Sequence, residues 1–287
     1  MLTLFITLVA AVVPGLVAWI VVHRWPRADP MAPTIKVEQV KSEARRHERL
    51  VAFFKSRLAP ESTTGLALSA GILVVVGGAV GVGFLIFMIH TNTGLARLDR
   101  GASLFGAHHA SRLSTRVLRV YTQLGGALVI VPLALIVAIV ETIRLRTAAV
   151  FAFLTLIVGG QFLIANITKS IIDRARPSFD QLTGFSGPSF PSGHAVAAAA
   201  CLAAFALLIG RGRSLRVRAV TAGLAVGLAT GIACTRVMLG VHWLTDVLGG
   251  LALGWAWFAL CSIAFGGRRL NFGAPAKAAQ EAVPTSK

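Results

Sequence analysis

The chain has 287 residues, of which 55% are hydrophobic and 14% are charged, and its mean hydropathy is +0.76. This composition is too apolar for an ordinary soluble domain and indicates a protein that crosses a membrane several times. The formal net charge of +17 could suggest nucleic-acid binding. Basic residues between long apolar runs are, however, more typical of cytoplasmic loops that face anionic lipid. We therefore predict a membrane lipid as the partner, and no nucleic acid.

Seven apolar stretches are each long enough to cross a bilayer, because about 20 apolar residues span its hydrocarbon core. They cover residues 1–22, 65–89, 121–141, 148–168, 190–210, 217–234 and 243–265. The first stretch lacks a basic n-region and a small-residue cleavage site, so we interpret it as a retained helix rather than a signal peptide. The predicted fold class is all-α, a polytopic membrane helix bundle.

The charge and composition of the segments outside these stretches divide the chain into three parts. Residues 1–64 form an N-terminal transmembrane helix and a basic cytoplasmic connector, 65–266 a six-helix core, and 267–287 a disordered cytoplasmic tail. Four apolar residues of the connector fall on one helical face: Leu50, Phe53, Phe54 and Leu58. This pattern predicts a helix on the inner membrane surface, with a solvated connector as the alternative.

The distribution of Lys and Arg predicts the orientation in the membrane. One side of the predicted bundle, which includes 23–64 and the C-terminal tail, carries 19 of the 28 Lys and Arg residues, and the other side carries 9. Cytoplasmic loops are enriched in these residues. We therefore expect a cytoplasmic C-terminus, with the N-terminus and the 169–189 loop on the outer face.

Glycines recur at intervals of four in three of the predicted helices. This spacing lets helix backbones approach closely in a membrane, so it predicts packing seams. The glycines concerned are Gly77 and Gly81, then Gly223, Gly227 and Gly231, then Gly250 and Gly254.

Ionisable residues stand at the ends of the fourth and fifth predicted helices. Lys169 and Arg176 are two helical turns apart and share a face if the fourth helix continues to Arg176, where Pro177 would stop it. The motif PSGH, residues 191–194, opens the fifth helix. As an ordinary helix start, it would place Ser192 as the cap and His194 at the lipid headgroups.

The segment TRVMLGVHWLTD, residues 235–246, ends the sixth helix and opens the seventh. Its Thr235, Arg236, His242 and Asp246 are polar residues at a membrane boundary. His242 and Asp246 are four residues apart and can share one helical face. A carboxylate inside a membrane needs a partner, and His242 is the nearest in the sequence.

Topology brings these helix ends to one side of the membrane, so their side chains can converge in one pocket. Three cations beside a helix N-terminus form a site for a dianion such as phosphate. Two histidines and an aspartate can supply a nucleophile, a general acid and an orienting group. The converging residues are Lys169, Arg176, Ser192, His194, Arg236, His242 and Asp246.

The order of these motifs resembles the type 2 phosphatidic acid phosphatase family, which shares it with the vanadium haloperoxidases. The matching segments are KSIIDRARP, PSGH and TRVMLGVHWLTD, and LARLDRGAS before the third helix is also similar. Thr235 stands where the family usually has Ser, so a hydroxyl is retained. The resemblance covers about residues 65–265 and implies a six-helix phosphatase core, to which this chain adds one N-terminal transmembrane helix.

The resemblance implies an integral-membrane phosphatase that hydrolyses a lipid phosphate or diphosphate through a phosphohistidine, with no metal or other cofactor. His242 would attack phosphorus, Asp246 would hold its ring, and His194 would protonate the leaving oxygen and then activate water. Phosphate would be bound by Lys169, Arg176, Ser192, Gly193, Thr235 and Arg236. Candidate substrates are a polyprenyl diphosphate, phosphatidylglycerol phosphate and phosphatidate.

Two alternatives remain open from the residues. A lipid phosphotransferase would use the same phosphohistidine but pass the phosphate to a second lipid or sugar. A non-enzymatic anion transporter would use the outer basic cluster to gather anions and would need no His–Asp pair.

The 90–120 segment is expected to be a loop over the outer interface. Its apolar residues Leu95, Leu98, Leu104 and Phe105 can dip into the membrane, and its cations Arg97, Arg100, Arg112 and Arg116 can meet anionic headgroups. We interpret His108 and His109 as surface residues, because adjacent positions on a helix diverge by about 100°.

Overall fold

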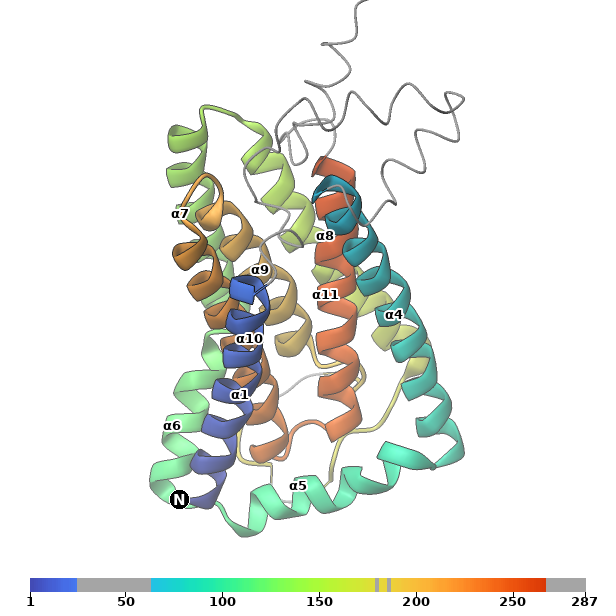
Figure 1. Ribbon diagram of the computed structural model, residues 1–287. Coiled ribbons are helices and arrows are strands. Elements are labelled where there is room, and N and C mark those ends of the chain that lie inside the picture. Colours follow the sequence, from blue (N-terminus) through green and yellow to red (C-terminus); the bar gives the residue numbers. More distant parts are fainter. Residues whose placement is uncertain (25–62, 179–180, 185–186, 267–287) are drawn as a thin grey trace, which may run out of the picture.

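The computed structural model describes residues 1–24, 63–178, 181–184 and 187–266. Seven of its helices are long and apolar enough to cross a membrane, which confirms the predicted number of spans and the all-α class. They are α1 (Leu2–Arg24), α4 (Thr63–Thr91), α7 (Ala127–Leu145), α8 (Ala149–Ile172), α9 (Gly193–Gly210), α10 (Leu215–Met238) and α11 (Leu244–Gly266) (Figure 1). The expected inner-surface helix of the connector and the C-terminal tail lie outside the described residues.

The segment expected to be a loop is helical. It forms the short 3₁₀ helix η2 (Gly94–Leu98), then α5 (Asp99–His108), which crosses one end of the bundle, and α6 (Arg112–Gln123) (Figure 1). Ser111 and Ser114 start α6 with reciprocal hydrogen bonds between side chain and backbone. The third span was predicted to begin at residue 121, but it begins at Ala127, because α6 ends in a turn at Gly125 and Gly126.

The centre of the bundle is α9, which is buried along most of its length between α8, α10 and α11. Its alanine-rich sequence leaves little side-chain volume, so its neighbours approach the backbone closely. A Cβ atom at Gly254 of α11 would lie 2.5 Å from the carbonyl oxygen of Val196, and one at Gly250 would lie 2.8 Å from that of Ser192. The predicted seam at Gly250 and Gly254 is therefore confirmed.

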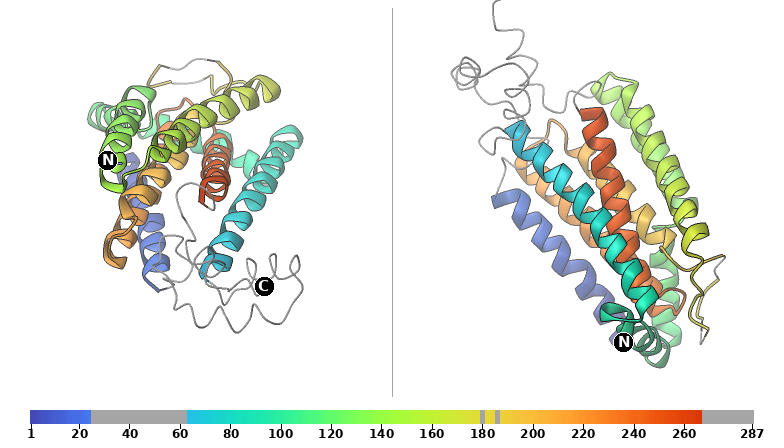
Figure 2. Two further views of the ribbon diagram at one scale, coloured as in Figure 1. Left: turned by 90° about the horizontal axis from the view of Figure 1, so that it is seen from above. Right: turned by 90° about the vertical axis from the view of Figure 1, so that its right-hand side faces the viewer.

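A second seam joins α1 to α10 (Figure 2). A Cβ atom at Gly223 would meet the carbonyl oxygen of Gly15 at 2.8 Å, and one at Gly227 would meet that of Ala11 at 2.7 Å. Gly231 packs against the Tyr121 hydroxyl. This seam was predicted, and it shows that the N-terminal helix lies directly against α10.

The predicted seam on α4 is wrong in its register. A Cβ atom at Gly77 or Gly81 would meet nothing within 4 Å, whereas one at Gly78 would lie 2.8 Å from Ala256 Cβ. Helix α4 does pack on α11, but through the face that carries Gly78. The rotation of α4 about its axis therefore decides which glycine is used.

Alternating helix directions bring four helix ends together. The C-terminal ends of α8 and α10 and the N-terminal ends of α9 and α11 lie at the end of the bundle where α1 begins, which we call the site end (Figures 1 and 2). Helices α5 and α6 lie at the same end. The fold thus brings together the segments that carry the predicted site residues.

Candidate active site

His242 lies in the turn before α11 and is 2% exposed. Its Nδ1 is 3.4 Å from Asp246 Oδ2, and its Nε2 is 3.1 Å from Nη1 of Arg176. A guanidinium can only donate hydrogen bonds, so Nε2 accepts and the ring proton belongs on Nδ1, facing Asp246. Burial lowers the pKa of His242 to about 4 despite the opposing effect of the Asp246 carboxylate, so the ring is neutral at pH 7. This arrangement leaves Nε2 unprotonated, as a nucleophile requires.

Asp246 has stronger partners than the histidine that the sequence predicted for it. Arg174 Nη1 lies 2.6 Å from Oδ1, and the backbone N–H of Trp243 donates to Oδ2 at 2.9 Å. The expectation of His242 as the partner of this carboxylate was therefore incomplete. A buried carboxylate that accepts several charged or backbone donors is fixed in orientation, so Asp246 presents one oxygen edge to the imidazole.

Arg174 continues the network to a second buried carboxylate. Its Nη2 lies 2.7 Å from Oδ2 of Asp99, at the start of α5. Asp99 also accepts from the backbone N–H of Thr245 at 2.8 Å and from its hydroxyl at 2.7 Å. Sequence reasoning missed Asp99 and Arg174 as site residues. Asp99 lies in the LARLDRGAS stretch that already resembled the family, and that was the only signal available for it.

Two buried polar atoms on the other side of the site have no hydrogen-bond partner within the described ranges. Ser192 occupies the N-cap position of α9 and is fully buried, but its hydroxyl makes no capping bond. Arg236 is 4% exposed, and although its Nη1 donates to the Thr122 hydroxyl at 3.2 Å, its Nε is unpaired. Buried polar groups are nearly always satisfied, so two in one site point to an oxygen-rich ligand. Ser192 is thus the N-cap of α9 by position, but its side chain does not make the capping hydrogen bond of an ordinary helix start.

Arg176 reaches the site by a different route from the predicted one. Helix α8 ends at Ile172, because Asp173 turns into the left-handed region with φ 42° and its N–H bonds back to the Lys169 carbonyl. Arg176 therefore lies beyond α8, whereas Lys169 lies within its last turn. The Arg176 guanidinium donates to the carbonyl oxygens of Gly187, Pro188 and Val241 at 2.8 to 3.1 Å. These bonds tie the 187–188 segment to the residue before His242.

His194 and Lys169 lie near the other predicted site residues. The positive charges of Lys169, Arg176 and Arg236 lie close enough to His194 to act on it electrostatically, and the charges of Arg176, Arg236 and Asp246 act in the same way on Lys169. The predicted site residues therefore share one region.

Two further predicted phosphate contacts have different surroundings. A Cβ atom at Gly193 would meet nothing within 4 Å, so a ligand has room to approach this backbone. The Thr235 hydroxyl donates to the carbonyl oxygen of Ile232 at 2.6 Å within α10. The hydroxyl hydrogen of Thr235 is therefore already engaged with the backbone of α10, whereas we expected it to contact phosphate.

A known protein family matches the segment that contains the site residues from Lys169 to Asp246. The model of the PAP2 superfamily matches residues 147–270. Phosphatidylglycerophosphatase B of Bacillus subtilis is 30% identical over 187 residues, which cover 62% of this chain and 90% of that protein. The chain belongs to the PAP2 superfamily. The resemblance inferred from the three motifs is confirmed.

Other proteins similar to this chain are phosphatases as well. Lipid A 1-phosphatases of Rhizobium johnstonii and Rhizobium etli are 41% and 40% identical over 120 residues, or 38% of this chain. The match spans less than half the length of these two relatives, 44% and 47%. The crystal structure of a transmembrane PAP2 type phosphatidylglycerolphosphate phosphatase from Bacillus subtilis is similar with a TM-score of 0.63 at 29% identity, over 69% of this chain and 98% of that chain. The similarity to this solved structure thus extends over more of the chain than the segment 147–270 that the family model matches.

Proposed function

We propose that this PAP2 protein is a membrane phosphatase that hydrolyses a lipid phosphate or diphosphate through a phosphohistidine formed on His242. The observation that carries the proposal is the pair of unpartnered buried groups, Ser192 Oγ and Arg236 Nε, in the same site as a neutral histidine. A phosphate oxygen satisfies both groups, and the cations Lys169 and Arg176 balance its charge. The names of the relatives, all of them phosphatases of lipids, support the same class of substrate.

The first chemical step transfers the phosphoryl group to the enzyme. Nε2 of His242 forms a bond to phosphorus while the bond from phosphorus to the lipid oxygen breaks. His194, which binds a proton once the negative charge of the bound phosphate offsets the surrounding cations, donates that proton to the lipid oxygen. Arg176 Nη1, which donates to Nε2, transfers its hydrogen bond to a phosphate oxygen. Asp246 stabilises the positive charge that develops on the ring, as the carboxylate of a catalytic triad does.

The second step releases inorganic phosphate. His194, now neutral, accepts a proton from a water molecule whose oxygen attacks phosphorus, and the bond to Nε2 breaks. If a lipid or sugar hydroxyl replaces water, the same residues give a phosphotransferase. The ratio of inorganic phosphate released to substrate consumed separates the two reactions, and a ratio of one is expected for hydrolysis.

The proposal is tested by acid quench of purified protein with ³²P-labelled lipid phosphates: a polyprenyl diphosphate, phosphatidylglycerol phosphate, phosphatidate and a phosphorylated glycolipid. His242→Ala should form no phosphoenzyme and have no activity while remaining folded. His194→Ala should accumulate phosphoenzyme, because its breakdown also needs this residue. Lys55→Ala, in the connector, is a control that leaves turnover unchanged. Full activity of His242→Ala, or turnover of glucose 6-phosphate equal to that of the best lipid, would refute the proposal.

We further propose that the site end faces the outside of the cell and that the C-terminus is cytoplasmic, on the basis of the 19 to 9 distribution of Lys and Arg. Gly184 is exposed at the site end. A cysteine placed there should react with a membrane-impermeant maleimide in intact cells, whereas a reporter fused after Lys287 should be cytoplasmic. Labelling of residue 184 only after lysis would reverse the orientation.

A further inference from the structure

The turn between α6 and α7 lies directly against His194. A Cβ atom at Gly125 would be 3.0 Å from the carbonyl oxygen of His194 and 2.7 Å from Cγ2 of Ile232 on α10. A Cβ atom at Gly126 would be 3.6 Å from Nε2 of the same histidine. Both glycines are buried, so their backbone packs against the first turn of α9. The turn therefore forms the wall of the site next to His194.

Gln123, the last residue of α6, places its side chain beside this wall. Its Oε1 is 3.3 Å from the Cβ position of Gly126 that lies 3.6 Å from His194 Nε2. Oε1 and Nε2 are therefore no more than about 7 Å apart, and within the described part of the chain no hydrogen bond joins them directly. A water molecule that makes two hydrogen bonds of about 2.8 Å spans about 4.5 to 5.5 Å. A single water molecule can thus bridge Gln123 and His194.

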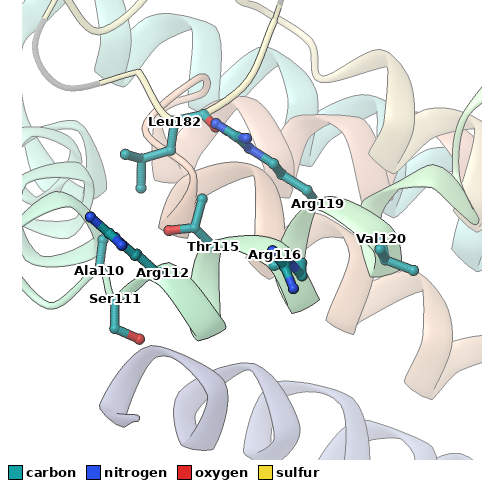
Figure 3. A pocket seen from close by; sticks show the side chains of 8 residues that line it. All are labelled: Ala110, Ser111, Arg112, Thr115, Arg116, Arg119, Val120 and Leu182. Atoms are coloured by element: carbon teal, nitrogen blue, oxygen red, sulfur yellow. The ribbon is translucent and has the colours of Figure 1, made fainter.

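Gln123 is the neutral last member of an otherwise cationic row on α6. Arg112, Arg116 and Arg119 lie on one helical face and line a surface pocket beside Leu182 (Figure 3). Gln123 follows Arg119 by four residues and continues this face. A guanidinium at position 123 could only donate hydrogen bonds, whereas the amide oxygen of glutamine accepts them. Among the residues that the structure describes, the Gln123 amide has no hydrogen-bond partner, so its oxygen is available to a reactant.

We infer that Gln123 selects water rather than an alcohol as the acceptor of the phosphoryl group, a role that rests on the proposed function. In the second step, one O–H of the attacking water donates to His194 Nε2 and the other donates to Gln123 Oε1, which leaves a lone pair to attack phosphorus. The new bond from oxygen to phosphorus forms while the bond from phosphorus to His242 Nε2 breaks, and the first proton passes to His194. The second hydrogen stays on the oxygen and leaves with the phosphate.

An alcohol cannot satisfy both acceptors, because it has only one O–H group. When that group donates to His194, an alkyl group takes the place of the second hydrogen, and Gln123 loses its hydrogen bond to the attacking molecule. The contribution of one such hydrogen bond favours water by about fivefold. The lipid oxygen that leaves in the first step also carries only one hydrogen, so Gln123 has no corresponding effect on formation of the phosphoenzyme.

The test measures how the phosphoenzyme divides its phosphoryl group between water and methanol. Each protein receives, at a fixed methanol concentration, the ³²P-labelled lipid of the panel above that the wild type turns over fastest. Labelled inorganic phosphate and methyl phosphate are then counted. Gln123→Leu removes the acceptor oxygen and should lower the ratio of inorganic phosphate to methyl phosphate about fivefold. Gln123→Glu retains an acceptor oxygen and should keep this ratio within about twofold of the wild-type value.

Asn166→Leu is the matched control, because it also replaces an exposed amide by an apolar side chain. Asn166 lies on α8 and donates to the carbonyl oxygen of Phe162 in its own helix. Its product ratio should equal that of the wild type. The rate of phosphoenzyme formation, measured by acid quench, should be unchanged in all three variants, which shows that each of them is folded.

An unchanged product ratio in Gln123→Leu overturns the inference and leaves the proposed function standing, because the wild type still forms the phosphoenzyme. An equal fall in Gln123→Leu and Gln123→Glu also overturns the inference, since the loss would then come from the shape of the side chain and not from its acceptor oxygen. Absence of phosphoenzyme in the wild type overturns the proposed function and this inference with it.

Discussion

The bridge from Asp99 through Arg174 to Asp246 is expected to hold the active-site carboxylate in position, and Asp99→Asn tests this role. The substitution keeps the shape of the side chain and removes its charge. Asp99 is 3% exposed and accepts three hydrogen bonds, of which only that from Arg174 joins two full charges. Removing one member of a buried ion pair can destabilise by about 3 to 5 kcal/mol when the other is left unpaired. In Asp99→Asn, Arg174 keeps its ion pair with Asp246. We therefore expect the free energy of unfolding to fall by about 2 kcal/mol, which is the contribution of one hydrogen bond to a charged group.

The effect on catalysis follows from the relative lengths of the contacts around Asp246. The distance to His242 is 3.4 Å, whereas those to Arg174 and Trp243 are 2.6 and 2.9 Å. When Arg174 is released from Asp99, the carboxylate moves with it, and the long contact to His242 is lost first. We expect kcat to fall about tenfold, equivalent to about 1.4 kcal/mol, with little change in KM because Asp99 does not contact the phosphate-binding groups.

A double-mutant cycle of Asp99→Asn and Arg174→Met measures the coupling, with kcat from phosphate release and the free energy of unfolding from denaturation in detergent. The coupling energy should exceed about 1 kcal/mol in both measurements. Asp173→Asn is the matched control, because Asp173 is an exposed aspartate at the same end and Asn tolerates its left-handed backbone. Additive effects in the cycle, or a loss of kcat in the control as large as in Asp99→Asn, would refute the reasoning.

Three further predictions concern pH, packing and phosphate binding. Burial lowers the pKa of His242 from 6.5 to about 4, so its contribution to stability is present above pH 6.5 and lost as pH falls toward 4. Between pH 6.5 and 4.5 the free energy of unfolding should fall by about 2 to 3 kcal/mol more in the wild-type protein than in His242→Gln. An equal dependence of this free energy on pH in the two proteins would contradict the prediction. Gly254→Ala should lower the unfolding temperature, since its Cβ would lie 2.5 Å from a carbonyl oxygen, whereas Gly81→Ala, which meets no atom, should leave it equal or higher. A lower unfolding temperature for Gly81→Ala than for Gly254→Ala would show that α9 and α11 are packed less closely than described. Thr122→Val removes the acceptor of Arg236 and should lower kcat/KM about tenfold, with unchanged kcat/KM as the contrary result.

Some features could be predicted from the sequence because they depend on local properties. A run of about 20 apolar residues is enough to identify a membrane helix, so the seven spans were found. The positions of Lys169, Ser192, His194 and His242 at helix ends followed from the same runs, since alternating helices bring alternate ends together.

Other features depend on three-dimensional geometry that no local pattern encodes. Glycines are common in membrane helices, so Gly125 and Gly126 did not indicate that one helix ends and another begins between α6 and α7. Gly78 rather than Gly77 faces α11, because one residue turns a helix by about 100°. The ion pair between Asp99 and Arg174 joins residues 75 positions apart, and neither residue's neighbours specify the other.

The seam between α1 and α10 determines which surface of the protein is available to other molecules. Gly223, Gly227 and Gly231 form a strip without side chains on α10, and Gly15 and Ala11 of α1 fill it. Without α1 this strip would be a ready-made groove for a helix of another protein molecule, as small residues at intervals of four are in membrane dimers. Because α1 occupies the groove within the same chain, any self-association must use a different face, and the end of α10 that carries Arg236 is supported in every copy independently of its neighbours.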